Sequence, residues 1–360
     1  MRTPLGLVAL TLAASLTGSL VAPSSADTAD RAEEAKYRWS TTVVDADQSF
    51  RGLDAVDATT AWVSGASLTD GGAAKVFLTT DAGATWQDVS PPDSEGLNFR
   101  DVEAEDALTA SVLAIGEGEA SRIYRTTDGG ATWTETFRNT DPKAFFNCMD
   151  FSRGGKVGLA VSDPVGGKFQ IARTKDRGRS WTVLDDRRMP RSTGEFNFSA
   201  SGDCLVFAGR NAYFGSGGDV ARVYRSTDQG RTWAASETTL PTGEAAGVFA
   251  LAFRTPRAGV AVGGDFEAPD DGTDATALLR RGNRWTAGGD LRHLGEDASW
   301  SRGMLLVVGQ GGEDGGSSIS RDLGATWTRF SKAGFHTLDC YGADCWAAGG
   351  DGRVGTVRIG

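Results

Sequence analysis

Thr80-Asp81-Ala82-Gly83-Ala84-Thr85-Trp86 is the stretch that predicts the architecture of this 360-residue chain, because its pattern recurs at regular intervals. Close copies span 127–133, 176–181, 228–233 and 322–327, and a weaker copy keeps only Gly282 and Trp285. The tryptophans of successive copies lie 42 to 52 residues apart. That interval is typical of one four-stranded blade of a β-propeller.

The acid and the tryptophan of each copy are predicted to be structural. An aspartate in a tight turn can accept hydrogen bonds from backbone N–H groups of that turn, and the glycine supplies a positive φ. Each tryptophan is expected between adjacent blades, where its burial contributes about 2–3 kcal/mol. Metal or substrate binding by the acids is the alternative. The residues concerned are Asp81, Trp86, Asp128, Trp133, Asp176, Trp181, Asp228, Trp233, Asp322 and Trp327.

Short apolar segments predict the remaining strands. Seven runs such as Val112–Gly116 suit strands that are buried on both faces. Trp39 lies one period before Trp86 and is expected on the outer strand of a blade whose other strands come from the C-terminus. The predicted fold is all-β: a seven-bladed β-propeller of four-stranded antiparallel blades, closed by pairing of the N- and C-terminal strands. Innermost strands are expected at 50–57, 99–106, 145–152, 196–201, 248–254, 294–301 and 335–342.

The N-terminus has the pattern of a secretory signal. Arg2 precedes a diluted apolar run from Leu5 to Ala22, and Ser24-Ser25-Ala26 fits a cleavage site with small residues. We therefore expect a signal peptide over 1–26, a leader over 27–36, and the propeller over 37–360 of a secreted or extracytoplasmic protein. An uncleaved signal that anchors the chain in a membrane is the alternative.

The net charge and the cysteine content indicate which classes of partner and which cellular compartment suit this protein. The formal net charge is −10, and the sequence shows no basic cluster, which argues against nucleic acid and anionic membrane surfaces. Four cysteines in an exported chain are compatible with disulfides. Cys340 and Cys345 flank a predicted hairpin turn and are expected to form a disulfide. Whether Cys148 and Cys204 also pair is left open.

The repeat resembles the Asp-box, or bacterial neuraminidase repeat, which sialidase, sortilin and photosystem II assembly factor-like propellers share. The layout is most similar to exported assembly factor-like proteins, with supporting features at Ser162–Phe169, Gly194–Phe196 and Gly259–Asp265. This resemblance covers nearly all of the chain after the signal. It implies the propeller fold but no defined activity, although such proteins often carry the label oxidoreductase.

No complete catalytic constellation is found in the sequence. Gly350-x-Gly352-x-x-Gly355 has dinucleotide-binding spacing, but the helix that this motif requires cannot follow it. The early arginine signature of sialidases is absent, and there is no nucleophile elbow for a serine hydrolase. The two histidines, His293 and His336, lack a metal-ligand pattern. We expect no metal and no cofactor.

Function is expected on the face formed by the strand 2–3 and strand 4–1 loops, around the channel mouth. Our interpretation is a monomeric propeller that binds an unidentified protein or saccharide ligand there, as a binding or scaffold module. A carbohydrate-active hydrolase and an oxidoreductase remain as alternatives, and no catalytic residue can be assigned. Candidate binding residues are Asp163, Lys168, Arg210, Tyr213, Asp265, Glu267 and His336.

Overall fold

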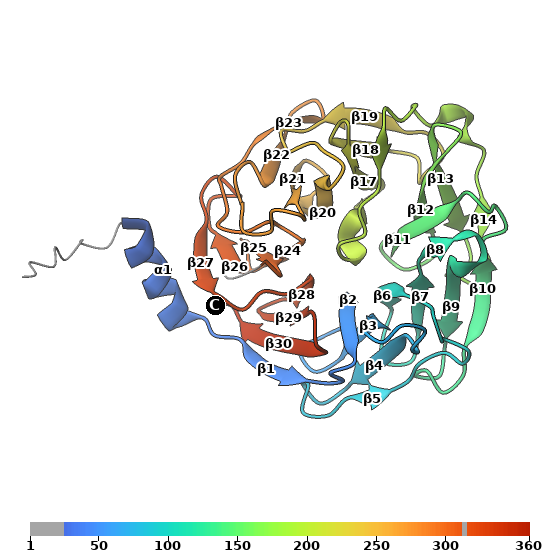
Figure 1. Ribbon diagram of the computed structural model, residues 1–360, viewed down its shortest axis with the longest axis horizontal. Coiled ribbons are helices and arrows are strands. Elements are labelled where there is room, and N and C mark those ends of the chain that lie inside the picture. Colours follow the sequence, from blue (N-terminus) through green and yellow to red (C-terminus); the bar gives the residue numbers. More distant parts are fainter. Residues whose placement is uncertain (1–24, 312–314) are drawn as a thin grey trace, which may run out of the picture.

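The computed structural model describes residues 25–311 and 315–360, and these form sheets that stand around a common centre, as in a β-propeller (Figure 1). The chain passes around the ring in sequence order, so that each sheet packs against its neighbours in the chain. Within the described residues, no helix is long and apolar enough to cross a membrane. Most of the predicted signal peptide, 1–26, lies outside them.

Five of the six sheets have one principal four-stranded path, with the innermost strand named first here. The first contains β2 (Gln48–Ala55), β3 (Ala61–Ser67), β4 (Lys75–Thr79) and β5 (Gln87–Asp88). The second contains β6 (Phe99–Ala104), β7 (Ala110–Ala114), β9 (Arg122–Thr126) and β10 (Thr134–Arg138). The third contains β11 (Phe145–Phe151), β12 (Gly158–Val165), β13 (Lys168–Thr174) and β14 (Thr182–Val183), with β8 (Gly116–Glu117) added at its edge.

The other two sheets of this kind lie at the end of the chain. One contains β24 (Asp297–Ser301), β25 (Met304–Gly309), β26 (Gly316–Ser320) and β27 (Thr328–Ser331). The other contains β28 (Thr337–Tyr341), β29 (Asp344–Ala348), β30 (Arg353–Arg358) and β1 (Ser40–Val43). The helices are α1 (Ser25–Lys36) and the short 3-10 turns η1 (Gly118–Ala120), η2 (Asp186–Arg188) and η3 (Gly202–Cys204).

The sixth sheet has nine strands but contains two four-stranded groups. One group is β16 (Leu205–Ala208), β17 (Asn211–Gly218), β18 (Arg222–Ser226) and β19 (Ala234–Glu237). The other is β20 (Ala246–Thr255), β21 (Ala258–Asp265), β22 (Thr276–Arg280) and β23 (Arg284–Ala287). Among the described residues, the pair Gly217–Gly247 alone joins the groups, and β15 (Glu195–Phe196) pairs with the end of β17.

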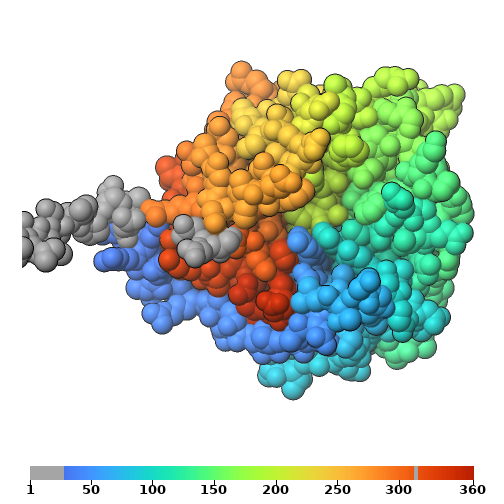
Figure 2. Space-filling model, in the orientation of Figure 1, coloured from blue at the N-terminus to red at the C-terminus, as the bar shows by residue number. Residues whose placement is uncertain are grey.

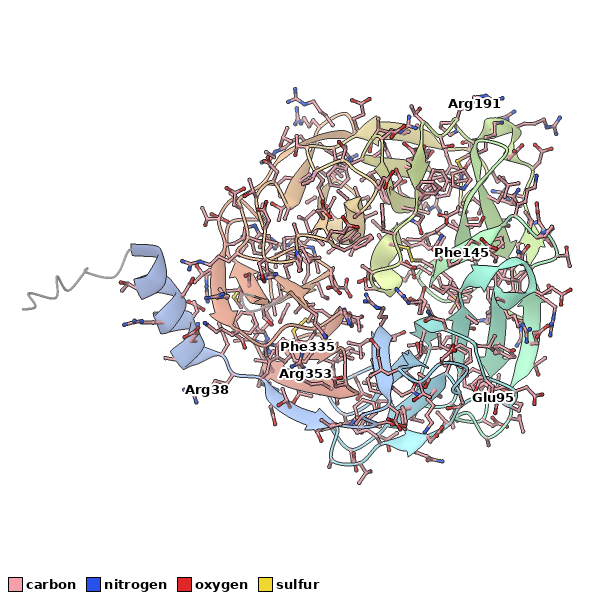
Figure 3. The ribbon with its side chains drawn as sticks, viewed as in Figure 1. Arg38, Glu95, Phe145, Arg191, Phe335 and Arg353 are labelled. Carbon is pink, nitrogen blue, oxygen red and sulfur yellow. A yellow bond between two sulfur atoms is a disulfide. The ribbon has the colours of Figure 1, made fainter. Side chains whose placement is uncertain are left out.

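The two ends of the chain meet in one sheet. β1 pairs antiparallel with β30, from Ser40 opposite Thr356 to Val43 opposite Arg353. In Figure 2 the blue N-terminal residues accordingly pack against the red C-terminal ones. Figure 3 labels Phe335 and Arg353 side by side in this sheet, where the guanidinium lies 5.0 Å from the centre of the phenyl ring.

The repeated turn has the same hydrogen bonds in all five strong copies. In the second copy, one carboxylate oxygen of Asp128 accepts from the Thr132 N–H at 2.9 Å and from the Thr126 hydroxyl at 2.8 Å. The second oxygen accepts from the Thr132 hydroxyl at 2.6 Å. The Thr126 hydroxyl also accepts from the Gly130 N–H, whose residue has a φ of 81°. The aspartate therefore has its acceptors filled by its own turn, as its expected structural role requires.

The segment expected as a leader, 27–36, lies within helix α1, which packs against β27. Asp30 accepts from the Arg329 N–H at 3.0 Å and pairs with Arg292 at 3.2 Å. Glu33 pairs with Arg321 at 2.9 Å. The helix thus covers the outer strand of that sheet at the left of Figure 1.

The prediction of an innermost strand at 196–201 is wrong. The innermost position between β11 and β20 is taken by β16, and residues 198–204 instead enter the centre of the ring. Figure 1 shows this segment as a yellow-green turn inside the ring. A disulfide between Cys148 on β11 and Cys204 holds its end. We call residues 198–204 the plug.

Candidate functional site

A cavity of about 560 Å³ opens at the centre of the ring, on the side of the strand 2–3 loops. Four of its floor residues occupy one repeated position, the residue that follows a phenylalanine near the start of an inner strand. Phe50-Arg51, Phe99-Arg100, Phe146-Asn147 and Phe335-His336 repeat this pair, in which every phenylalanine is fully buried. Strand alternation then turns the next side chain toward the centre. The floor consists of Arg51, Arg100, Asn147, Phe249, Glu296 and His336, and we call the cavity the mouth.

Two arginines on the mouth floor face one glutamate. Arg51 donates to the Ala200 carbonyl at 2.8 Å and lies 3.5 Å from the Glu296 carboxylate, to which His336 also bonds. Arg100 donates to the Ser199 carbonyl at 2.6 Å. Burial, followed by the charge of Arg51, lowers the pKa of Arg100 to about 9, so this guanidinium stays charged at neutral pH. The floor therefore carries excess positive charge.

Burial favours the neutral form of the histidine of this floor. Burial lowers the pKa of His336 below its usual value, although the neighbouring Glu296 acts in the opposite direction. The ring nitrogen Nδ1 meets the carboxylate, and the side chain is almost fully buried. His336 can therefore position Glu296 in the mouth.

One wall of the mouth is aromatic. The ring of Phe198, in the plug, lies 5.3 Å from that of Phe249 and 6.1 Å from that of Phe266. Phe266 is 54% exposed, which is unusual for so large an apolar side chain. Phe145, Ile115 and Leu294 add to the apolar lining (Figure 3 labels Phe145). The mouth thus combines apolar contact area with a few buried polar groups, as ligand sites do.

The plug separates the mouth from a ring of carboxyl groups deeper in the channel. Asp54 accepts from the Ala104 N–H at 2.6 Å, Asp101 from Met149 at 2.6 Å, and Asp339 from Ala55 at 2.9 Å. Asp297 accepts from Leu338 at 2.8 Å, and Asp150 from Phe207. Each bond joins one inner strand to the inner strand of the next blade. These five residues, with Glu103 and Asp203, form what we call the acid ring.

The acid ring retains protons at pH values where aspartate is ordinarily ionised. Burial, followed by the charge of Asp339, raises the pKa of Asp54 to about 8. Burial is also the main cause that raises Asp150 and Asp297, each to a pKa of about 7. Asp54, Asp150 and Asp339 keep part of their surface open to the channel lumen, which limits the free energy of these shifts. Among the described residues, no group of His, Cys, Asp or Glu is arranged to hold a metal ion.

The predicted binding residues divide into two sets. Asp163 and His336 line the mouth. Asp163 accepts from the Asn147 amide at 3.1 Å and from the Asn197 N–H at 2.9 Å, and burial raises its pKa to about 6. Asp265 ends β21 beside Phe266, and Glu267 is exposed on the same loop.

The structure places Lys168, Arg210 and Tyr213 outside the lining of the mouth. Lys168 instead donates to the Asp186 carbonyl at 2.8 Å. Because β16 is the innermost strand of its group, Arg210 lies in the turn between strands 1 and 2, on the opposite side. Tyr213 on β17 is fully buried and donates to the Pro256 carbonyl at 3.1 Å.

The sequence analysis missed Arg51, Arg100 and Glu296. A usable signal was present, since alignment of the inner strands on their phenylalanines places Arg51, Arg100, Asn147 and His336 in one column. The structure also pairs the remaining cysteines, Cys340 with Cys345, across the β28–β29 hairpin.

Comparison with known proteins shows the fold alone. The chain is similar to the structure of YCF48 bound to D1 peptide, with 16% identity and a TM-score of 0.60 over 89% of this chain and 95% of that one. The structure of YCF48 from Cyanidioschyzon merolae gives 16% identity and a TM-score of 0.60, over 90% of this chain and 98% of that one. For the WD40 β-propeller domain of Doa1, the sequence identity is 13% and the TM-score is 0.57, over 89% of this chain and 96% of that one. No family model matches the chain, and no curated protein is similar to it in sequence.

Proposed function

We propose that this protein is an exported seven-bladed propeller that binds a segment of a partner protein in the mouth. The observation that carries the proposal is the mouth itself, where an exposed aromatic wall faces a floor with two arginines and one glutamate. Apolar side chains of a partner would pack on Phe198 and Phe266. Polar or anionic groups would meet Arg51 and Arg100. The bound peptide in the YCF48 structure supports a protein segment as the ligand of such a fold.

The count of seven blades rests on the strand pairings. The nine-stranded sheet divides into two four-stranded groups with a single residue pair between them, so we interpret it as two blades. With β1 as the outer strand of the last blade, every blade has four strands and the ring is closed. The filled acceptors of the repeated turn support its assignment as an Asp-box with a structural role.

Export is supported by the N-terminal signal pattern and by the cysteine pairs. Cys148–Cys204 and Cys340–Cys345 account for all four cysteines, and such bridges persist in oxidising compartments. We therefore place the protein outside the cytoplasm, with residues 1–26 as the signal and 37–360 as the propeller. Neither enzymatic alternative is carried forward, because no feature of the described residues favours catalysis.

Site-specific photo-crosslinking in the producing cell tests the proposed face. A photoreactive phenylalanine analogue at Phe266, on the mouth rim, should capture one dominant protein. The same analogue at Leu108 is the matched control, because this side chain is similarly exposed, at 57%, but lies in a strand 1–2 turn on the opposite side. Capture of the same protein with equal yield from both positions would contradict the assignment of the face.

A further inference from the structure

Three consecutive blades carry arginine at one position of the third strand. Arg125, Arg173 and Arg225 each pair with the residue after the tryptophan of the repeated turn, namely Thr134, Thr182 and Ala234. The same position holds Leu78, Leu278 and Ile319 in other blades, where it is buried. An apolar side chain therefore satisfies the fold at this position. The three arginines need a different explanation.

Each of these arginines lines a cavity between its own blade and the next, on the side of the repeated turns. The cavities have volumes of about 420, 550 and 440 Å³, and we call them grooves 1, 2 and 3. Strands β9, β13 and β18, which carry the arginines, follow one another around the ring in Figure 1. Basic side chains line every groove: Arg125, Arg153 and Arg177 in groove 1; Arg173, Lys175, Arg187, Arg188 and Arg231 in groove 2; Arg225, Arg257, Arg280 and Arg281 in groove 3.

The arginines at the base of grooves 2 and 3 each have a buried N–H donor without a hydrogen-bond acceptor among the described residues. Arg173 is only 5% exposed, and it donates to the Gln229 side chain at 3.1 Å, whereas its Nε has no hydrogen-bond partner among the described residues. The Nε of Arg225 is likewise buried and unpartnered within the described chain. A buried N–H group without an acceptor costs free energy, because it has lost its hydrogen bonds to water. An anion in the groove would remove this cost.

Acidic side chains offset the basic ones most in groove 1, where Glu103 and Glu105 line the cavity and Arg177 pairs with Glu105 at 2.8 Å. Basic side chains outnumber acidic ones by five to two in groove 2. The oxygens of Asp228 accept from Thr232 at 2.9 and 2.8 Å and from Ser226 at 2.9 Å, within their own turn. Asp185 pairs with Arg187 at 2.8 Å, and no acidic residue lines groove 3. Burial, followed by the charge of Arg231, lowers the pKa of Arg173, as expected where cations crowd together.

The sequence shows no basic cluster, but the folded protein has one. The basic residues come from separate blades and form no run in the sequence, so only the fold gathers them. We propose that grooves 2 and 3 together form an anion-binding belt for a linear polymer of phosphate groups. The belt is independent of the mouth, because it lies on the other side of the ring.

Two features favour a phosphate polymer. Equivalent grooves in successive blades present guanidinium groups at repeated intervals, and these match a ligand with repeated tetrahedral anions. The grooves offer no exposed aromatic side chain on which bases could stack, since Tyr213 is fully buried and Phe151 packs edge-on against Trp181. This argues against single-stranded nucleic acid, which uses such platforms.

Titration with inorganic polyphosphate tests the belt. We expect binding at low salt that weakens as salt increases, and that is at least tenfold tighter for a long chain than for tripolyphosphate or orthophosphate. Arg173→Leu/Arg225→Leu should weaken polyphosphate binding at least tenfold and make the salt dependence shallower. This variant should fold, because leucine occupies the same position in two other blades.

The matched control is Arg38→Leu/Arg358→Leu, which removes two positive charges from exposed arginines outside the grooves. It should bind polyphosphate within twofold of the parent protein. Equal loss in both variants, or none in either, would overturn the belt. If poly-glutamate binds more tightly than polyphosphate, the ligand is an acidic protein, and if oligothymidylate does so, it is a nucleic acid; either result contradicts a phosphate polymer. Orthophosphate that binds as tightly as polyphosphate would show isolated anion sites in place of a belt.

Discussion

A chain that begins at Val44 should melt at least about 10 °C below one that begins at Tyr37 and should aggregate as it is concentrated. The longer chain keeps β1, Tyr37 and Trp39. The ring of Trp39 lies 4.9 Å from that of Phe335, and its indole N–H donates to Ser317 at 2.9 Å. Tyr37 is 3% exposed and packs edge-on against Phe330.

Both aromatic side chains and the outer strand of the closing blade are lost in the shorter chain. Loss of the two rings alone removes about 4–6 kcal/mol of apolar burial, and β30 becomes an unpaired edge that invites aggregation. Differential scanning calorimetry and light scattering on the two chains measure the effect. Melting temperatures within about 2 °C of each other would mean that the ring does not depend on β1 for closure.

The second large effect is a loss of stability as pH rises. In the unfolded chain the acid-ring carboxyls ionise near pH 4, whereas in the folded protein Asp54 holds its proton to a pKa of about 8, and Asp150 and Asp297 to about 7. The folded state therefore binds more protons between pH 4 and pH 8, so the free energy of unfolding falls across this window. We expect the melting temperature at pH 8 to lie roughly 10 °C below that at pH 5.

The variant Asp54→Asn isolates the cause of this pH dependence. Its amide oxygen can still accept from the Ala104 N–H, but the side chain cannot ionise. The difference between the two melting temperatures should therefore become smaller, while the other six carboxyls of the acid ring keep part of it. Asp70→Asn is the control, because Asp70 is exposed on the loop between β3 and β4 and should leave the difference unchanged. A melting temperature that rises from pH 5 to pH 8 would show that the acid ring does not hold its protons.

Local patterns predict most of the strands because each depends on nearby residues. The repeated turn closes through hydrogen bonds between residues two to four apart, such as Thr132 to Asp128, and is therefore readable from sequence. The segment 196–201 misled the analysis because Phe-Asn-Phe-Ser alternates like an inner strand. A bridge between cysteines 56 residues apart, and the arginine contacts to Ser199 and Ala200, hold it in the channel instead.

The sites were harder to predict because they combine residues from several blades. His336 and Asp163 could be selected as polar residues near the expected channel, but nothing local marks Glu296 as the partner of His336. The basic belt was missed for the same reason. Arg173 and Arg225 are about 50 residues apart and become neighbours only through the ring. Alignment of the repeats by strand register, rather than by the turn motif alone, would have revealed both sets.

Binding isotherms of the partner captured at Phe266 test the central claim, that the mouth is the protein-binding face. Arg100→Gln/Phe266→Ala should weaken the affinity at least tenfold, because it removes a buried charge and an exposed aromatic anchor from the mouth. Arg173→Leu/Arg225→Leu, on the opposite side, should bind the partner like the parent protein, and melting curves check that both variants are folded. Unchanged affinity in the mouth variant, with loss in the other, would contradict the account.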